Sequence, residues 1–152
     1  MLTLYWLFFT LLTFVALFIV IPYQRIQQLF SFGFWLGFFL ASVVNWLGIA
    51  MLGWLMPGDI LLFGIPFFSS LYFIPLAIGF AHYYPLKKDW MVKVDYVLLF
   101  AAITTFLQSL LAIFGMWQGT SGWNVAYTFI LAALIHTVMT VYYLSVEIKQ
   151  VA

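Results

Sequence analysis

The chain has 152 residues, of which 67% are hydrophobic and only 6% are charged, and its formal net charge is +1. A water-soluble domain carries about 25% charged residues, so this composition excludes an ordinary soluble protein and predicts one solvated largely by lipid. The small net charge excludes an electrostatic nucleic-acid partner, and the lack of cysteine excludes disulfides and cysteine-ligated metal sites.

The chain opens with an uncharged apolar stretch, residues 2–21, which is long enough to cross a bilayer once. Pro22 ends this stretch, because proline disrupts a helix. The following residues, 23–31, are polar and contain Arg25. Their apolar positions have helical spacing, so this segment is either a short helix at the membrane surface or a plain loop.

A second span is expected over residues 32–56. Gly33, Gly37 and Ala41 recur every four residues in it, a row of small residues that lets another helix approach closely. Glycine is also common in membrane helices without this packing role. Asn45 lies near the middle of the span, and because a buried amide needs hydrogen-bond partners, we expect it to face other helices.

The third span, residues 60–84, is expected to be irregular. Pro66 and Pro75 each lack an amide hydrogen and clash with the preceding turn, so both are predicted to kink the helix. Ser69 and Ser70 lie between the two prolines, near the middle of the membrane. Broken helices line substrate sites in many transporters, whereas prolines in membrane helices also act as purely structural kinks.

The last two spans are expected over residues 95–117 and 124–146, and each carries a polar residue at mid-depth. These residues are Gln108 in the fourth span and His136 in the fifth. Around His136, a largely polar row advances in steps of three or four residues, which places its members on one helix face. The row consists of Thr128, Ala132, His136, Thr140 and Tyr143.

The basic residues fix the expected orientation. With five spans, all of them fall in segments on one side of the membrane, and the positive-inside rule makes that side cytoplasmic. The sequence therefore predicts one transmembrane domain, an all-α integral membrane bundle of five transmembrane helices, with the N-terminus outside and the C-terminus in the cytoplasm. The basic residues are Arg25, Lys87, Lys88, Lys93 and Lys149.

Tryptophan and tyrosine residues cluster near the ends of the expected spans, which is typical of side chains anchored at membrane interfaces. Trp54, Trp117 and Trp123 are expected near the outer face, and most of the tyrosines near the inner face. This interpretation places the aromatic residues against lipid headgroups, and it removes most of them from consideration as parts of a binding site.

Four spans each offer a polar residue near the midplane of the membrane. Such side chains are costly in lipid and normally face the interior of a bundle. They either bond to one another and fix helix orientation, or they line a polar pocket with His136 as its titratable group. No catalytic or metal-binding motif accompanies them, so the sequence indicates no cofactor and no metal and does not favour an enzyme. The candidate binding residues are Asn45, Ser69, Ser70, Gln108 and His136.

Three features occur together in the second half of the chain. A Pro-Leu-Lys-Lys loop follows an aromatic span end, from Tyr83 to Lys88; an apolar span covers residues 96–117; and Gly122-Trp123-Asn124 opens the last span. Through these features, residues 66–143 resemble a group of uncharacterised small multi-pass membrane proteins of spore-forming Gram-positive bacteria. The resemblance implies the bacterial plasma membrane as the location and implies no activity.

These patterns favour a small polytopic membrane protein that serves as a scaffold or accessory subunit and packs against other membrane proteins. The glycine row and the lack of a catalytic motif carry this interpretation. Its expected partners are the lipid bilayer and either other membrane subunits or further copies of the chain. The alternative is a small transporter or channel component with a polar midplane site among spans two to five, and the broken third span and the midplane polar residues carry it.

Overall fold

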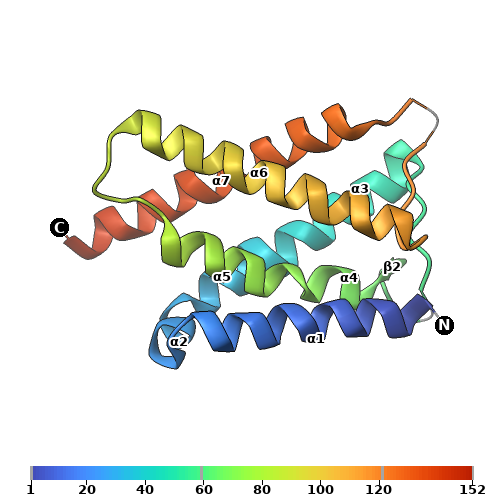
Figure 1. The fold of residues 1–152 in the computed structure, drawn as a ribbon, viewed down its shortest axis with the longest axis horizontal. Helices are drawn as coiled ribbons and strands as arrows, with labels where there is room; N and C mark the ends of the chain where they lie inside the picture. The colour runs from blue at the N-terminus through green and yellow to red at the C-terminus, as the bar shows by residue number, and fades with distance from the viewer. Residues whose placement is uncertain (1, 59, 121, 152) are drawn as a thin grey trace.

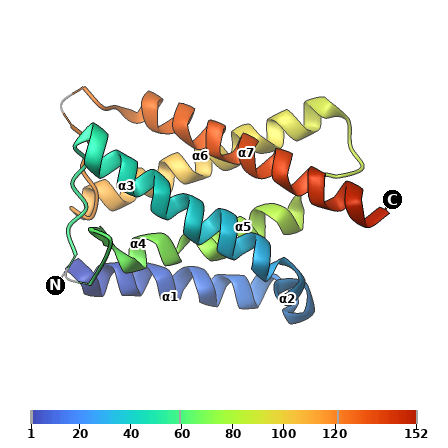
Figure 2. The same ribbon diagram turned by 180° about the vertical axis from the view of Figure 1, so that it is seen from behind.

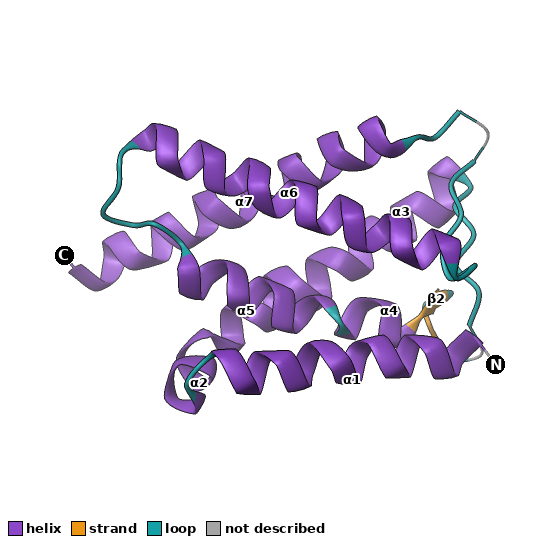
Figure 3. Ribbon diagram, viewed as in Figure 1, coloured by secondary structure: helices purple, strands orange, loops and turns teal. Residues whose placement is uncertain are grey.

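The computed structural model describes residues 2–58, 60–120 and 122–151. These residues form a helical bundle with a short β-hairpin, and the chain runs back and forth between two ends so that its termini lie at opposite ends (Figure 1). Figure 3 shows the hairpin at the end that holds the N-terminus. The elements are α1 (Leu2–Val20), α2 (Tyr23–Phe32), η1 (Gly33–Phe39), α3 (Leu40–Leu52), β1 (Leu61–Leu62), β2 (Ile65–Pro66), α4 (Phe67–Leu71), α5 (Phe73–Tyr83), α6 (Trp90–Ile113) and α7 (Val125–Val151).

Four helical stretches of the described chain are long and apolar enough to cross a membrane. They are Thr3–Val20, Tyr23–Leu52, Trp90–Ile113 and Val125–Val146. The third predicted span contains only a shorter apolar helical stretch, Phe67–Tyr83. The all-α fold class is therefore confirmed, whereas the number of membrane crossings stays a prediction.

The second long helix begins at Tyr23, so the polar segment that precedes the predicted second span is helical and is not a loop. Pro22 lies just before the first turn, where its missing amide hydrogen breaks no helical hydrogen bond. α2 buries Ile26, Leu29 and Phe32 and exposes its glutamines. This amphipathic pattern starts the helix well before the expected start at residue 32.

η1 is a π-helical segment that joins α2 to α3 without a break. Its hydrogen bonds span five residues, so each turn holds more residues than the 3.6 of an α-helix. Residues four apart in a straight α-helix drift by about 40° per step around the axis. The wider turn of η1 offsets part of this drift, and Gly33, Gly37, Ala41 and Asn45 all remain buried on one side.

The start of the third predicted span is a hairpin and not a helix. β1 and β2 pair antiparallel, and the two turn residues between them, Phe63 and Gly64, have φ angles of 51° and 84°. Two consecutive positive φ angles form the tight turn that matches the twist of a hairpin, and glycine favours this conformation. Pro66 therefore lies in β2 ahead of α4 and kinks no helix, which corrects its predicted role.

The interruption in this segment lies at Tyr72, between α4 and α5. Pro75 is in the first turn of α5 and has no amide hydrogen to donate to the carbonyl of Leu71. That missing bond is one of those that would carry an α-helix across Tyr72. The expected irregularity near Pro75 is thus present on its N-terminal side.

The ends of the last two helices also differ from the prediction. α6 ends at Ile113, because Gly115 has a φ of 68° and closes a helix-terminating turn. The Met116 amide donates to the Leu111 carbonyl at 2.9 Å, the bond that defines this type of C-terminal cap. α6 begins at Trp90, before the expected residue 95, and α7 continues to Val151.

The helices form two layers. α6 and α7 pack against each other as an antiparallel pair, while α1, α2–η1–α3 and α4–α5 form the other layer (Figures 1 and 2). Within the second layer, α5 lies against η1 and α2. Large aromatic side chains bridge the two layers, such as Phe80 of α5 with Tyr96 and Phe100 of α6. The space between the layers holds the candidate site.

Candidate functional site

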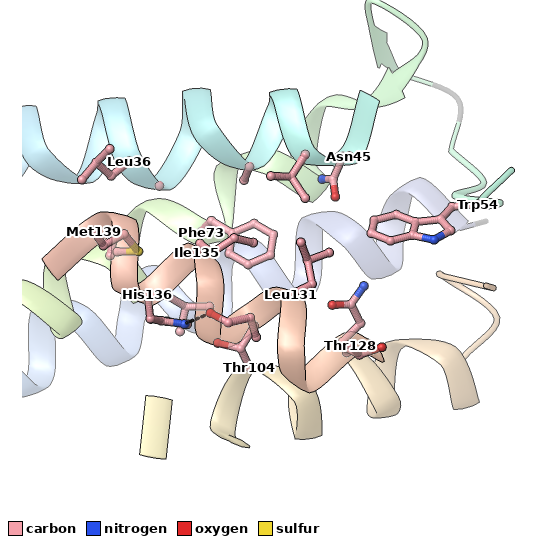
Figure 4. Close-up of a pocket in the computed structure, with 17 residues that line it drawn as sticks. Leu36, Asn45, Trp54, Phe73, Thr104, Thr128, Leu131, Ile135, His136 and Met139 are labelled. Atoms are coloured by element: carbon pink, nitrogen blue, oxygen red, sulfur yellow. Dashed lines mark hydrogen bonds between the residues drawn. The ribbon is translucent and has the colours of Figure 1, made fainter. Parts of the chain in front are cut away.

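A cavity of about 50 Å³ lies between the two layers. η1, α3 and α5 wall it on one side, and α6 and α7 wall it on the other (Figure 4). Most of the lining is apolar, but three helices each direct at least one polar residue to it. The polar lining residues are Asn45, Thr104, Gln108, Thr128 and His136. Three of the five predicted midplane residues thus meet at one cavity.

Asn45 of α3 is the most constrained of these polar groups. Its residue is 5% exposed, and its amide nitrogen has no hydrogen-bond partner among the described residues. Figure 4 shows the amide extending from α3 into the cavity. Burying an amide without a partner costs roughly 1–3 kcal/mol in proteins. A molecule in the cavity that accepts a hydrogen bond would offset this cost.

His136 of α7 is held in a defined orientation. Its Nδ1 donates to the Ala132 carbonyl at 2.8 Å, one turn earlier in the same helix. Because a carbonyl only accepts, Nδ1 carries the proton, and in the neutral ring Nε2 remains an acceptor. The ring centroids of Phe80 and Phe100 lie 5.2 and 5.9 Å from that of the imidazole, so both rings pack against it.

α6 and α7 supply the remaining polar lining. Thr104 and Gln108 are four residues apart on α6 and so lie on one face of that helix. Thr128 of α7 is bonded on both sides, because its hydroxyl accepts from Trp123 Nε1 at 2.9 Å and donates to the Asn124 carbonyl at 3.3 Å. Thr128 therefore has less free hydrogen-bonding capacity than Asn45 or Gln108.

The two predicted serines lie outside the cavity lining. Ser69 and Ser70 are in α4, before the interruption at Tyr72, and are 0% and 1% exposed. The Ser69 hydroxyl donates to the Pro66 carbonyl at 2.6 Å, which stabilises the first turn of α4. The structure therefore does not bring these two serines to the cavity that Asn45 lines.

A tryptophan cluster lies at the end of the cavity nearer the N-terminal end of the bundle. Trp54 lines the cavity, and its ring centroid is 5.6 Å from that of Trp117 and 5.0 Å from that of Trp123. Trp54 and Trp117 are only 3% and 7% exposed, so these two are not the lipid-facing anchors that their positions suggested. Gly48 makes the room, because a Cβ at that position would overlap the Trp54 indole.

A second aromatic cluster lies beyond His136. Phe80, Tyr84, Tyr96 and Tyr143 pack with ring centroids 5.3 to 5.8 Å apart and connect α5, α6 and α7. The Tyr96 hydroxyl donates to the Phe80 carbonyl at 2.8 Å. The cavity therefore lies between two aromatic clusters, one toward each end of the bundle.

The small residues of the second helix pack inside the chain. A Cβ at Gly37 would lie 2.7 Å from the Phe73 carbonyl oxygen, and one at Gly33 would lie 2.6 Å from the Ile78 side chain. η1 thus touches α5 almost backbone to backbone, and Ala41 lines the cavity. Since this close approach is intramolecular, the row does not indicate a partner subunit.

Thr128, Ala132, His136 and Tyr143 of the face predicted around His136 are buried, and its fifth member, Thr140, is half-buried. Sequence reasoning missed Trp54 as a wall of the site, and the signal for it was Gly48, four residues before the end of α3. No group of three or more metal-ligating side chains occurs in the described part of the chain. No protein family, curated protein or solved structure matches this sequence.

Proposed function

We propose that the chain is a five-pass membrane protein of the bacterial plasma membrane, with its N-terminus outside. Four of the passes are the long helices, and the remaining one, third in chain order, is the interrupted segment Phe67–Tyr83. Its 17 residues are at the short end of the range that crosses a bilayer. α2 and the loop before α6 lie at the end of the bundle away from the N-terminus (Figure 1). These two segments carry Arg25, Lys87 and Lys88, which favours that end as the cytoplasmic one.

We further propose that the cavity is the substrate site of a small transporter or channel component. The unpartnered Asn45 amide, buried in an apolar bundle and extending into a cavity, carries this proposal. A polar group in such a place is normally bonded or faces a functional cavity. Aromatic clusters on both sides of the cavity fit a site closed toward each face of the membrane.

A purely structural role for the polar residues predicts that they bond to one another. The hydrogen bonds of the described residues do not follow that pattern: His136 bonds to its own helix, and Thr128 bonds to neighbours in sequence. Asn45 leaves its amide nitrogen unused. This distribution favours a binding site over a structural lock between helices.

The test measures the entry of small solutes into lipid vesicles that contain the purified protein. It compares the natural chain with the variant Ala132→Leu. Ala132 is 3% exposed and lines the cavity, so the larger side chain fills it. The neighbouring variant Ala133→Leu, outside the lining, is the matched control. We expect the natural chain and Ala133→Leu to accelerate flux over empty vesicles and Ala132→Leu to lose that acceleration. Equal flux in all three, with the proteins folded, contradicts the proposal.

A second candidate function is that of an accessory subunit in a larger membrane complex. Trp35, Phe39 and Trp46 are each about half exposed on the outward side of η1 and α3, which offers an aromatic contact surface for a partner. Purification in mild detergent separates the two functions. Stoichiometric co-purification of another membrane protein, lost in Trp35→Ala with Trp46→Ala, supports the subunit role.

A further inference from the structure

We infer that the cavity takes a small uncharged molecule that both donates and accepts hydrogen bonds. The inference rests on the proposed function, because it names the class of substrate for that same site. Three properties of the lining lead to it: the volume of the cavity, the absence of charge, and the kinds of hydrogen-bonding groups.

The volume sets an upper limit on size. A cavity holds one water molecule when it offers roughly 10–15 Å³ to a water-sized probe, so about 50 Å³ admits a few water molecules or one solute of similar bulk. Leu36, Phe73 and Ile135 contribute bulky side chains to the walls. A sugar, a nucleotide or a lipid headgroup is too large for a cavity of this volume.

The lining excludes an ion as the preferred occupant. Among the described residues, those that line the cavity include no lysine, arginine, aspartate or glutamate. An ion that enters a largely apolar cavity loses its hydration and finds no opposite charge there, which is strongly unfavourable. A neutral polar molecule loses far less, because hydrogen bonds to amide, hydroxyl and imidazole groups replace its bonds to water.

The free hydrogen-bonding groups call for both a donor and an acceptor. Asn45 presents an N–H that needs an acceptor. The neutral His136 ring, with its Nδ1 proton committed to Ala132, retains an acceptor at Nε2. Gln108 adds an amide that offers both kinds of group. Amides, urea-like compounds and small alcohols are molecules that satisfy such a set.

The experiment compares permeation of urea with that of potassium and chloride in vesicles that contain the purified full chain. Urea is the neutral probe, and the rate of vesicle re-swelling measures its entry. We expect the protein to accelerate urea entry and to leave both ion conductances at the level of empty vesicles. Asn45→Leu should slow the urea rate about tenfold, the factor that one net hydrogen bond is worth.

Val43→Leu is the matched control, because Val43 is an exposed residue on the same helix, and it should transport like the natural chain. Gln108→Leu tests the site a second time if Asn45→Leu does not fold. Ion flux that is lost in Asn45→Leu overturns the inference and leaves the proposed function standing. If the folded protein accelerates the entry of none of the probes, both the proposed function and the inference are overturned.

Discussion

Single residues set how closely η1 and α5 approach each other. Gly37 of η1 faces the backbone of α5. A Cβ at this position would lie 2.7 Å from the Phe73 carbonyl oxygen and 2.8 Å from the Ile74 Cα. Backbone atoms cannot move aside as a flexible side chain does, so no side chain fits there without separating the helices. Asn45 lies two steps of four residues further along the same buried side. The close contact at Gly37 therefore helps to position the amide that faces the cavity.

Replacing Gly37 tests this contact. We expect Gly37→Val to lower the free energy of unfolding by about 1–3 kcal/mol, the usual cost of overpacking, and to lower the thermal midpoint in detergent. The matched control is Gly79→Ala in α5, where a Cβ meets nothing within 4 Å. That change should be neutral or stabilising by up to about 1 kcal/mol, because alanine favours the helix. Equal midpoints for the two variants would mean that η1 and α5 do not touch as described.

Among the elements, the segment between α3 and α6 differs most from a regular helix. A hairpin, the single turn α4, the interruption at Tyr72 and the helix α5 follow one another between Leu61 and Tyr83. The Phe68 carbonyl accepts two hydrogen bonds, from the Tyr72 amide at 3.3 Å and from the Thr10 hydroxyl of α1 at 3.1 Å, so α1 is bonded to the turn just before the break. Pro75 explains the break, because it cannot donate to Leu71.

The variant Pro75→Ala restores that donor. We expect α4 and α5 to join into one helix, so that the amides of residues 72, 73, 74 and 76 exchange with solvent deuterium more slowly than in the natural chain. Pro85→Ala, at a proline outside the helices, serves as the control and should leave exchange in this segment unchanged. Unchanged exchange in Pro75→Ala would assign the break to packing around Tyr72 and not to the proline.

The sequence predicted the helical elements well where one pattern dominates and poorly where local geometry decides. Long uncharged runs identified the helices, and the steps of three or four residues around His136 identified its buried face. The hairpin before α4 was missed because Leu61 and Leu62 are equally apolar in a strand and in a membrane helix. The burial of Trp54 was missed because tryptophan near a span end usually marks the interface, and only contact with Gly48 distinguishes the two cases.

The same limit explains the candidate site. Depth along each span was enough to bring Asn45, Gln108 and His136 together, because helices have a fixed rise per residue. Ser69 and Ser70 were placed at the same depth by assuming one continuous helix, but they lie in α4 before Tyr72 and do not line the cavity. Depth along a span alone therefore did not identify which polar residues line the cavity.

At the scale of the whole molecule, the bundle consists of two layers that aromatic side chains hold together at both ends. The tryptophan cluster connects the end of α3 to the loop between α6 and α7. The second aromatic cluster, around Phe80, connects α5 to α6 and α7. Between these clusters the layers enclose the cavity. The proposed transport role would place the substrate between these two layers, as in transporters whose site lies between two helical units.

Cysteine labelling tests the proposed topology directly, because the chain contains no cysteine of its own. Single cysteines replace Ile60, which is exposed just before the hairpin, and Lys88 in the loop before α6, so that they flank the short segment Phe67–Tyr83. In intact cells, a membrane-impermeant maleimide should label Ile60→Cys and should label Lys88→Cys only after the cells are opened. Labelling of both positions from one side would contradict the five-pass arrangement.

The proposed site requires that Asn45 extends into a cavity that receives a hydrogen-bond acceptor. The most direct measurement is an experimental structure in lipid nanodiscs at a resolution that reveals ordered water and small solutes. The account predicts density for a non-protein molecule about 2.7–3.2 Å from the Asn45 amide nitrogen, the distance of a hydrogen bond. A closed cavity in which that amide bonds directly to Gln108 or to another side chain would contradict it.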